Sequence, residues 1–385
     1  LHVRSRRQRQ MCIRDRGIVA APGIANQLSR KLVDTLPQLL QDNISSQFQW
    51  KIEVVVDELT GSAEEADLAY QKTEDFLDKY NWHYIISLTD LPLFHDNESV
   101  IAVDINEENG ASIISIPAYG WRPLTKRLEK TVITVIHEIN VLFRDHPNQN
   151  NNHENHQDAY RNIFPFSNLR KLRTYTDDTH TMHIRYIVAS KASGYFRLLS
   201  GMTFANNPLR LMKSMNSVIA IAFTTGASGL IFSTMWQLSN TFTALRLTIM
   251  SLLAVFGMIL WIILAHNLWE SERYSENKLI TRLYNLTTLT TLTTSVLIYY
   301  ITLLIIYLIA SLILLPPSFL GNALELSHPA PFTLYCSIAW FAASLSTIAG
   351  AIGAGMRNEK LVRESTYGAR QQMRKALFKE RNHMQ

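Results

Sequence analysis

The chain has 385 residues, of which 47% are hydrophobic, enough for two domains of ordinary size with buried cores. The formal net charge of +5 does not indicate a nucleic-acid-binding protein: residues 1–16 hold six Arg and one Asp, and the remaining 31 basic and 31 acidic residues (37 − 6 and 32 − 1) cancel. The two cysteines, Cys12 and Cys336, leave no disulfide framework and no cysteine-based metal site.

Residues 1–16 (LHVRSRRQRQMCIRDR) show no apolar periodicity and no apolar stretch typical of a signal peptide. Within them, MCIRDR resembles translated sequencing-adapter read-through. We interpret the segment as a basic arm that is either foreign to the fold or disordered. The folded part is expected to begin at Gly17.

Residues 17–146 alternate between strand and helix patterns. The expected strands are 17–22, 50–57, 82–90, 99–106 and 111–120, and the expected helices begin near Ile24, at 63 and near Pro123. Only short turns separate the last three strands, whereas a parallel crossover needs a dozen or more residues. We therefore predict a cytoplasmic α/β domain with a mixed sheet that is covered by helices.

Residues 147–214 are predicted to form a polar connector, rich in Asn at its start. Residues 183–190 (HIRYIVAS) alternate like a strand and could add an edge strand to the sheet. Residues 194–205 place Phe196, Leu199 and Met202, with Phe204 or Ala205, on one broad side of a helix. Such a juxtamembrane helix suits the membrane surface, and packing on the soluble domain is the alternative.

Four apolar segments follow, at about 215–238, 247–269, 286–315 and 332–356. Lys and Arg gather before the first segment, between the second and third, and in the tail 357–385, whereas the two hairpins contain only Arg246. The positive-inside rule then places both termini in the cytoplasm of a cell-membrane protein. The predicted fold class is an α/β domain with a mixed sheet, followed by an all-α four-helix transmembrane domain over 215–356.

Small residues recur every four positions in two of these segments. They allow membrane helices to approach closely, and they could equally face a partner protein or a second copy; the predicted packing residues are Ala222, Gly226, Ser346, Gly350 and Ala354. No acidic or basic residue occupies the middle of a span, and His266 lies near an end. This pattern argues against a pump or a secondary transporter. The basic tail is explained by attraction to anionic headgroups and requires no nucleic acid.

The segment TVITVIHEINVLFRDH (131–146) places a His-Glu pair in an apolar helix, as zinc peptidases of the zincin class do. A zincin needs a second His four residues after the first, but Val141 stands four residues after His137. Helical geometry also points His137 away from the apolar stripe. His137 and Glu138 are therefore weak candidates for catalysis or metal binding, and His137 is expected to face solvent.

Other candidate residues have equally plain structural explanations. The histidines that form His-x-x-His pairs and could bind a metal are His153, His156, His180 and His183. Asp90 and Asp104 lie near predicted strand ends, where capping is the commoner role. The turn AAPGIAN (20–26) leaves a strand and opens a helix, but it lacks the pattern of a phosphate-binding loop. No cofactor is predicted.

Several stretches resemble, in order, a family of multi-pass membrane proteins of Gram-positive bacteria: GIVAAPG, HYIISLTDLPL, GYFRLLSGMTFANNPLR, AHNLWE, RLYNLTTLTTL, LLPPSFL and RESTYGARQQ. The resemblance covers nearly everything after residue 16. Some members of that family carry a methylene-tetrahydrofolate dehydrogenase label, but this chain has no dinucleotide-binding glycine pattern. Over 17–146 the order of a strand ending in SLTDLPL, an edge strand, a strand ASIISIPA and the His-Glu helix is similar to archaemetzincin-type peptidases. That similarity implies a zincin-like fold that has lost its metal.

These patterns predict a multi-pass integral membrane protein whose cytoplasmic α/β domain is a non-catalytic binding or scaffolding module. Its expected partners are the lipid bilayer and either a protein partner or a second copy. Two alternatives stay open. One is a membrane-tethered, metal-dependent hydrolase of the zincin type, and the other is a small-solute permease that uses the Thr-rich third apolar segment.

Overall fold

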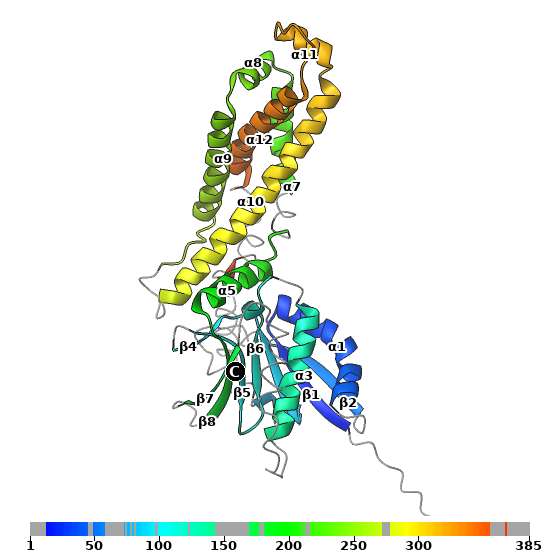
Figure 1. Cartoon of the computed structure of the whole chain (residues 1–385), viewed down its shortest axis with the longest axis vertical. Coiled ribbons are helices and arrows are strands. Elements are labelled where there is room, and N and C mark those ends of the chain that lie inside the picture. Colours follow the sequence, from blue (N-terminus) through cyan, green and yellow to red (C-terminus); the bar gives the residue numbers. More distant parts are fainter. Residues whose placement is uncertain are drawn as a thin grey trace, which may run out of the picture. The chain divides into compact units, whose positions relative to one another are not determined.

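In the computed structural model the chain divides into two compact units between Ala205 and Asn206. The first unit contains a sheet with helices and the second is helical (Figure 1). The structure describes residues 13–44, 49–57, 73, 75–77, 79–80, 82–96, 99–121, 124–142, 169–176, 181–209, 211, 216–271, 278–354 and 366–367.

The first unit is built on a mixed sheet. Its strands are β1 (Ile13–Ala20), β2 (Gln49–Val56), β3 (Tyr84–Thr89), β4 (Leu93–His95), β5 (Ser99–Asn106), β6 (Ser112–Ser115), β7 (Leu169–Thr176) and β8 (Thr181–Val188). They are ordered β2-β1-β3-β6-β5-β8-β7, with β4 paired to β5. The pairs among β2, β1, β3 and β6 are parallel, and the pairs that involve β4, β5, β7 or β8 are antiparallel. The predicted mixed sheet is confirmed.

The sheet begins before the predicted boundary at Gly17. Ile13 pairs with Gln49 and Gly17 pairs with Glu53 in one continuous parallel register. A ladder uses backbone groups that every residue here provides, so a segment without apolar periodicity can still extend a strand. Residues 13–16 therefore belong to β1, and residues 1–12 lie outside the described residues.

The predicted connector supplies two strands. A strand is present where one was predicted at 183–190, but β8 spans residues 181–188, and it is not the edge because β7 pairs with it on the outer side. No strand was predicted at β7, whose sequence LRKLRTYT carries three basic residues. Basic side chains are typical of edge strands, where they oppose pairing with other chains.

Helices cover the sheet. They are α1 (Ile24–Asn43), the short 3-10 helix η3 (Ile116–Tyr119), α3 (Thr125–Leu142) and α5 (Lys191–Ala205). Helical periodicity predicts a buried stripe on α3 of Leu128, Val132, Val135, Ile139 and Leu142; the first four are buried and Leu142 is half-buried. The helix expected over 63–80 lies largely outside the described residues.

α5 packs on the sheet unit through its glycine-bearing face. A Cβ atom on Gly201 would lie 2.3 Å from the carbonyl oxygen of Pro117, so only glycine permits this contact with η3. Met202 is fully buried, whereas Phe196 is 68% and Phe204 45% exposed. The prediction that Met202 lies with the two Phe side chains was wrong, because Met202 belongs to the packed face. The alternative prediction, that this helix packs on the soluble domain, is correct for the face that carries Gly201 and Met202.

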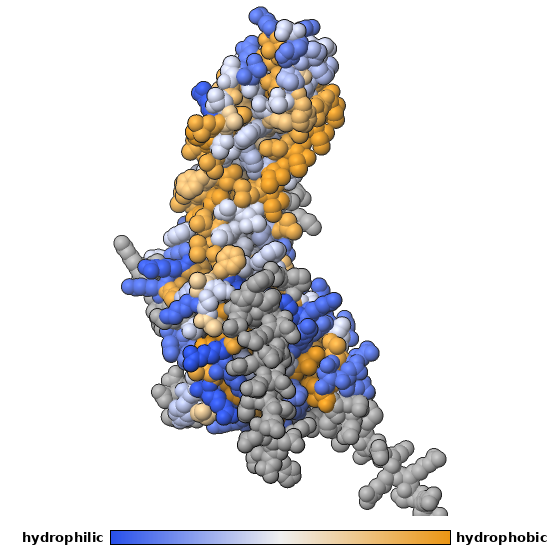
Figure 2. All heavy atoms as spheres, in the orientation of Figure 1, coloured by the Kyte–Doolittle hydropathy of each residue, from blue (hydrophilic) through white to orange (hydrophobic). Residues whose placement is uncertain are grey.

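The second unit contains only helices among its described residues. They are α7 (Asn216–Leu230), α8 (Ser233–Thr241), α9 (Ala244–Ala265), α10 (Lys278–Leu314), α11 (Pro317–Ala323) and α12 (Phe332–Ala354). Three of them, α9, α10 and α12, are long and apolar enough to cross a membrane. Hydrophobic residues gather on the surface of these helices in Figure 2.

The first predicted span, 215–238, is not one straight helix. α7 and α8 meet at an angle of 87° after Leu230. The Trp236 indole N–H donates to the Leu230 carbonyl oxygen at 2.7 Å and so supplies a partner at the end of α7. Counted as one broken span, the pair brings the number of candidate spans to four; length and composition alone establish three.

A tyrosine of α10 fills a gap that a glycine leaves in α7. The Tyr307 hydroxyl donates to the Ala222 carbonyl oxygen at 2.7 Å and lies 2.7 Å from Ser346 Oγ of α12. A Cβ atom on Gly226 would lie only 2.0 Å from the same hydroxyl. Three of the predicted packing residues, Ala222, Gly226 and Ser346, thus surround the Tyr307 hydroxyl.

The same arrangement recurs eight residues earlier on α10. Tyr299 is fully buried, and a Cβ atom on Gly350 of α12 would lie 2.3 Å from its hydroxyl oxygen. The side chain of Ala354, the last predicted packing residue, lies outside the described residues. Close packing of α10 against α7 and α12 therefore depends on the two glycines.

Candidate functional site

His137 and Glu138 are adjacent on α3, but their surroundings differ. His137 is exposed, as helical geometry predicted. Glu138 is 6% exposed, and its carboxylate forms an ion pair with Lys171 of β7. Val141, at the position of the second zincin ligand, is 51% exposed and has no atom that coordinates a metal. The pair therefore lacks the two-ligand arrangement of a zinc helix.

The start of α3 is tied to η3 by a buried phenol. The Tyr119 hydroxyl donates to Thr131 Oγ1 at 2.8 Å, and Arg127 Nη1 donates to the Tyr119 carbonyl oxygen at 2.6 Å. Burial raises the pKa of Tyr119 above its usual range, and the hydrogen bond with Thr131 opposes that rise in part. Tyr119 consequently stays neutral and acts as a hydrogen-bond donor that fixes α3.

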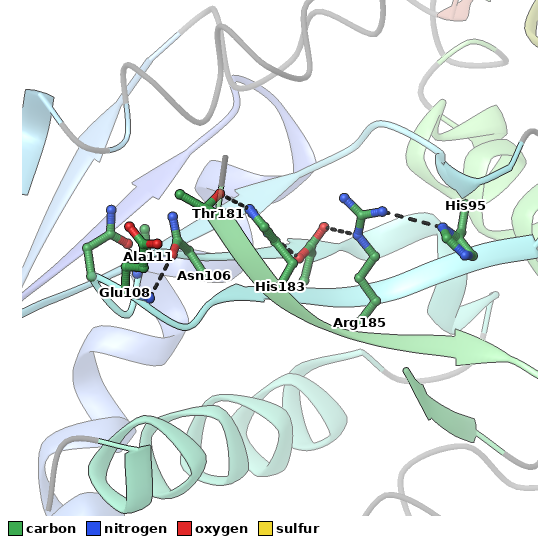
Figure 3. Close-up of polar contacts among 9 residues, drawn as sticks. His95, Asn106, Glu108, Ala111, Thr181, His183 and Arg185 are labelled. Atoms are coloured by element: carbon green, nitrogen blue, oxygen red, sulfur yellow. Dashed lines mark hydrogen bonds and ion pairs between the residues drawn. The ribbon is translucent and has the colours of Figure 1, made fainter. Parts of the chain in front are cut away.

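A network of charged side chains crosses β5 and β8 (Figure 3). Asp104 of β5 is 2% exposed, and its two carboxylate oxygens accept hydrogen bonds from His183 Nδ1 and Arg185 Nε, each at 2.9 Å. Arg185 is the cross-strand neighbour of Asp104, and His183 lies two residues along β8. Because side chains alternate along a strand, all three lie on one face of the sheet.

That face is opposite to the face that contacts α3. Lys171, which pairs with Glu138 of α3, is the cross-strand neighbour of Tyr186. Arg185 is adjacent to Tyr186 in β8, so its side chain points to the other face. The buried carboxylates of Glu138 and Asp104 are therefore neutralised separately, one on each face of the sheet.

The network extends beyond Asp104 in both directions. Thr181 Oγ1 lies 2.9 Å from His183 Nε2, and Arg185 Nη1 lies 3.4 Å from His95 Nδ1 of β4. A carboxylate only accepts, so His183 carries a hydrogen on Nδ1; a guanidinium only donates, so His95 accepts at Nδ1. His95 then carries its hydrogen on Nε2, which lies 3.2 Å from Asp96 Oδ2.

A tight turn positions the end of β5. Asn106 Oδ1 accepts from the Glu108 backbone N–H at 2.8 Å, and the Asn106 N–H donates to the Ala111 carbonyl oxygen at 2.8 Å. Gly110 has φ of 71°, a conformation that favours glycine. The turn joins β5 to β6, and at its start Asn106 is the cross-strand neighbour of His183 in β8.

The order hydroxyl, imidazole, carboxylate in Thr181, His183 and Asp104 is that of a nucleophilic triad. Two features of this site differ from a catalytic one. His183 is only 3% exposed, so a substrate has little access to its ring. Arg185 also binds the second oxygen of Asp104, so the carboxylate is already neutralised. The arrangement serves as a buried clamp that joins β5 to β8.

Sequence reasoning found parts of this network. It singled out Asp104, but as a residue near a strand end, and it singled out His183 as part of a metal-binding pair. It missed Arg185, Thr181 and His95. The available signal is the alternation of His183 and Arg185 on one face of the strand predicted at 183–190, which is unusual for a strand that is otherwise apolar; Thr181 precedes that predicted strand.

The remaining candidates do not converge on one site in the part of the chain that the structure describes. There, no group of three or more His, Cys, Asp or Glu could hold a metal ion. His153, His156 and His180 lie outside the described residues. Asp90 is fully buried directly after β3.

The turn at 20–26 uses its backbone groups internally. The Ala21 N–H donates to the Leu88 carbonyl oxygen at 3.0 Å, and the Asn26 N–H donates to the Ala21 carbonyl oxygen at 3.1 Å. Gly23 has φ of 98°, which requires glycine at the entry to α1. These contacts fit an ordinary strand-to-helix turn.

The described residues thus define a protein with a mixed α/β unit and a helical unit whose three apolar helices are compatible with a membrane protein. No family model, curated protein or solved structure matches the chain. Its function is therefore inferred from its own contacts.

Proposed function

We propose that the chain is a multi-pass protein of the cell membrane with four spans, in which α7 and α8 together form the first. Both termini lie in the cytoplasm, and the cytoplasmic α/β unit is a non-catalytic binding or scaffolding domain. The observation that most supports a non-catalytic role is that two of the buried acids of this sheet region, Glu138 and Asp104, are both held in ion pairs. A general acid or base needs an accessible group instead.

We also propose that the α/β unit is a zincin-like domain without its metal. The proposal rests on the sequence resemblance, whose elements in chain order are β3, β4, β5, β6 and α3, with β5 antiparallel to β6. In the present chain β8 pairs with β5 along Ile101–Asn106. Since β5 has a neighbour on both sides, a peptide cannot add to it as a further strand. A partner of this unit therefore binds elsewhere.

The permease alternative has less support. The hydroxyls of Thr287, Thr291 and Ser295 on α10 donate to carbonyl oxygens of their own helix, four residues earlier, at 2.7 to 2.9 Å. The single hydrogen of each hydroxyl is already donated within the helix, so each can offer a solute only a weak hydrogen-bond acceptor. Hydrogen bonds within α10 thus account for the donors of these three hydroxyls without a solute.

The proposed topology predicts which loops face the outside of the cell. After Cys12 and Cys336 are replaced by Ser, a single Ser327→Cys should react with a membrane-impermeant maleimide on intact cells. Ser327 is exposed in the α11–α12 connection, the side that the positive-inside rule places outside. Lys278→Cys at the start of α10 should react only after permeabilisation. Labelling of Lys278→Cys on intact cells would contradict the orientation.

The absence of a catalytic metal is tested on the intact protein. Full-length protein purified in detergent is expected to contain far less than one zinc per chain, and His137→Ala is expected to leave that content unchanged. Elemental analysis by mass spectrometry measures both. One zinc per chain that is lost in His137→Ala would instead establish the hydrolase alternative.

A further inference from the structure

Three large aromatic side chains are exposed along the outer side of α5 and the turn beside it. Trp121 is 62%, Phe196 68% and Phe204 45% exposed. The two Phe residues lie about 80° apart around α5. Trp121 follows Gly120, and a Cβ atom on Gly120 would lie 3.4 Å from Ser200 Oγ of α5. We call Trp121, Phe196 and Phe204 the aromatic face of α5.

The chain directly after α5 is fixed to a defined level of α10. Asn206 Nδ2 donates to Thr291 Oγ1 at 2.9 Å. Ser295 Oγ, which donates to the Thr291 carbonyl oxygen at 2.9 Å, also lies 3.1 Å from the Pro208 carbonyl oxygen, so the two carbonyl groups share one hydroxyl hydrogen. Both contacts lie within the helical unit, and they hold residues 206–208 beside Thr291 and Ser295.

The exposed side of α10 changes its chemistry at the same level. Between the start of α10 and Ser295 the exposed residues are Lys278, Arg282, Leu286 and Thr294, of which only Leu286 is apolar. After it, the exposed residues are apolar: Leu297, Ile301, Ile305, Ile309, Leu312, Ile313 and Leu314. The stretch from Leu297 to Leu314 is roughly 27 Å long, close to a hydrocarbon core of about 30 Å. The edge of the hydrocarbon therefore falls next to Thr291 and Ser295.

We propose that the aromatic face of α5 lies in the headgroup–acyl boundary of the cytoplasmic leaflet, so that the α/β unit is seated on the bilayer. This inference rests on the proposed function, because it takes α10 as a span. Only Ala205 lies between Phe204 and Asn206, so their Cα atoms are at most about 7 Å apart. Trp and Phe side chains prefer this boundary, where the rings leave water. In this arrangement α5 contacts the rest of the α/β unit through its packed face and lipid through its aromatic face.

The experiment uses the full chain in lipid nanodiscs, with Cys12 and Cys336 replaced by Ser. Single cysteines are introduced as Trp121→Cys, Phe196→Cys or Phe204→Cys and are spin-labelled. Collisions with oxygen, which concentrates in lipid, and with a water-soluble nickel chelate are measured by electron paramagnetic resonance. All three labels are expected to show an oxygen-to-nickel ratio several-fold above that of an aqueous site.

Two reference positions decide between the outcomes. Tyr175→Cys is the aqueous reference, because Tyr175 is also exposed but lies near the end of the β7–β8 hairpin, roughly one strand length of 26 Å from α5. Ile305→Cys is the lipid reference. If Ile305 shows lipid exposure and the aromatic face matches Tyr175, the inference fails alone. If neither reagent reaches the aromatic face, a protein surface covers it and the inference also fails. If Ile305 is itself aqueous, the proposed function fails.

Discussion

Asp104→Ala is expected to lower the free energy of unfolding of the α/β unit by about 3 kcal/mol. The change removes the carboxylate that accepts from both His183 and Arg185. The Arg185 side chain is only 18% exposed, so its charge would stay largely buried without its acid. Urea unfolding of the full-length protein in detergent, followed by circular dichroism, measures the loss.

Asp96→Ala is the matched control. Asp96 stands at the far end of the same network, but its side chain is 84% exposed, and the expected loss is below about 1 kcal/mol. Asp104→Asn should fall between the two, because the amide keeps one acceptor oxygen and loses the charge. If Asp104→Ala is as mild as Asp96→Ala, the network does not hold β5 to β8, and a functional role for its buried charges becomes the better explanation.

The sequence predicted those elements of the α/β unit that depend on a local pattern of apolar and polar residues. β3, β5 and β6 are apolar runs bounded by polar turns, and α3 repeats its apolar residues at helical spacing. The pairing of Asp104 with Arg185 is of another kind, because it depends on the register of β5 against β8 across 81 residues of sequence. Register is set by the assembled sheet, so a single sequence shows the alternation of polar residues on each strand but not which of them meet.

The helical unit shows the same limit. Hydropathy predicted 215–238 as one span because an averaged window does not register a bend, yet the helix breaks after Leu230, where Trp236 supplies the missing donor. The small residues Gly226 and Gly350 were recognised by their spacing. The sequence did not show that tyrosines of α10 fill the space beside these glycines. The residues of one helix do not indicate which other helix packs against it.

Gly226→Val is expected to destabilise the helical unit by about 3 kcal/mol. Its Cβ atom would lie 2.0 Å from the Tyr307 hydroxyl and 2.2 Å from Ser346 Oγ. Tyr307 cannot move aside cheaply, because it is fully buried, stacks on Phe223 at 5.7 Å and would lose its bond to the Ala222 carbonyl oxygen. Unfolding curves in mixed micelles with increasing sodium dodecyl sulfate measure the effect.

Gly257→Val separates this clash from the general effect of valine in a helix. Gly257 lies within α9, and a Cβ atom there meets nothing within 4 Å, so the expected change is within about 0.5 kcal/mol. The double variant Gly226→Val with Tyr307→Leu should lose less than the sum of the two single changes, because a shorter side chain at 307 makes room for the valine. Strictly additive losses would mean that α7 does not contact α10 at this point. The support for counting the bent α7–α8 pair as a fourth span packed within the bundle would then be lost.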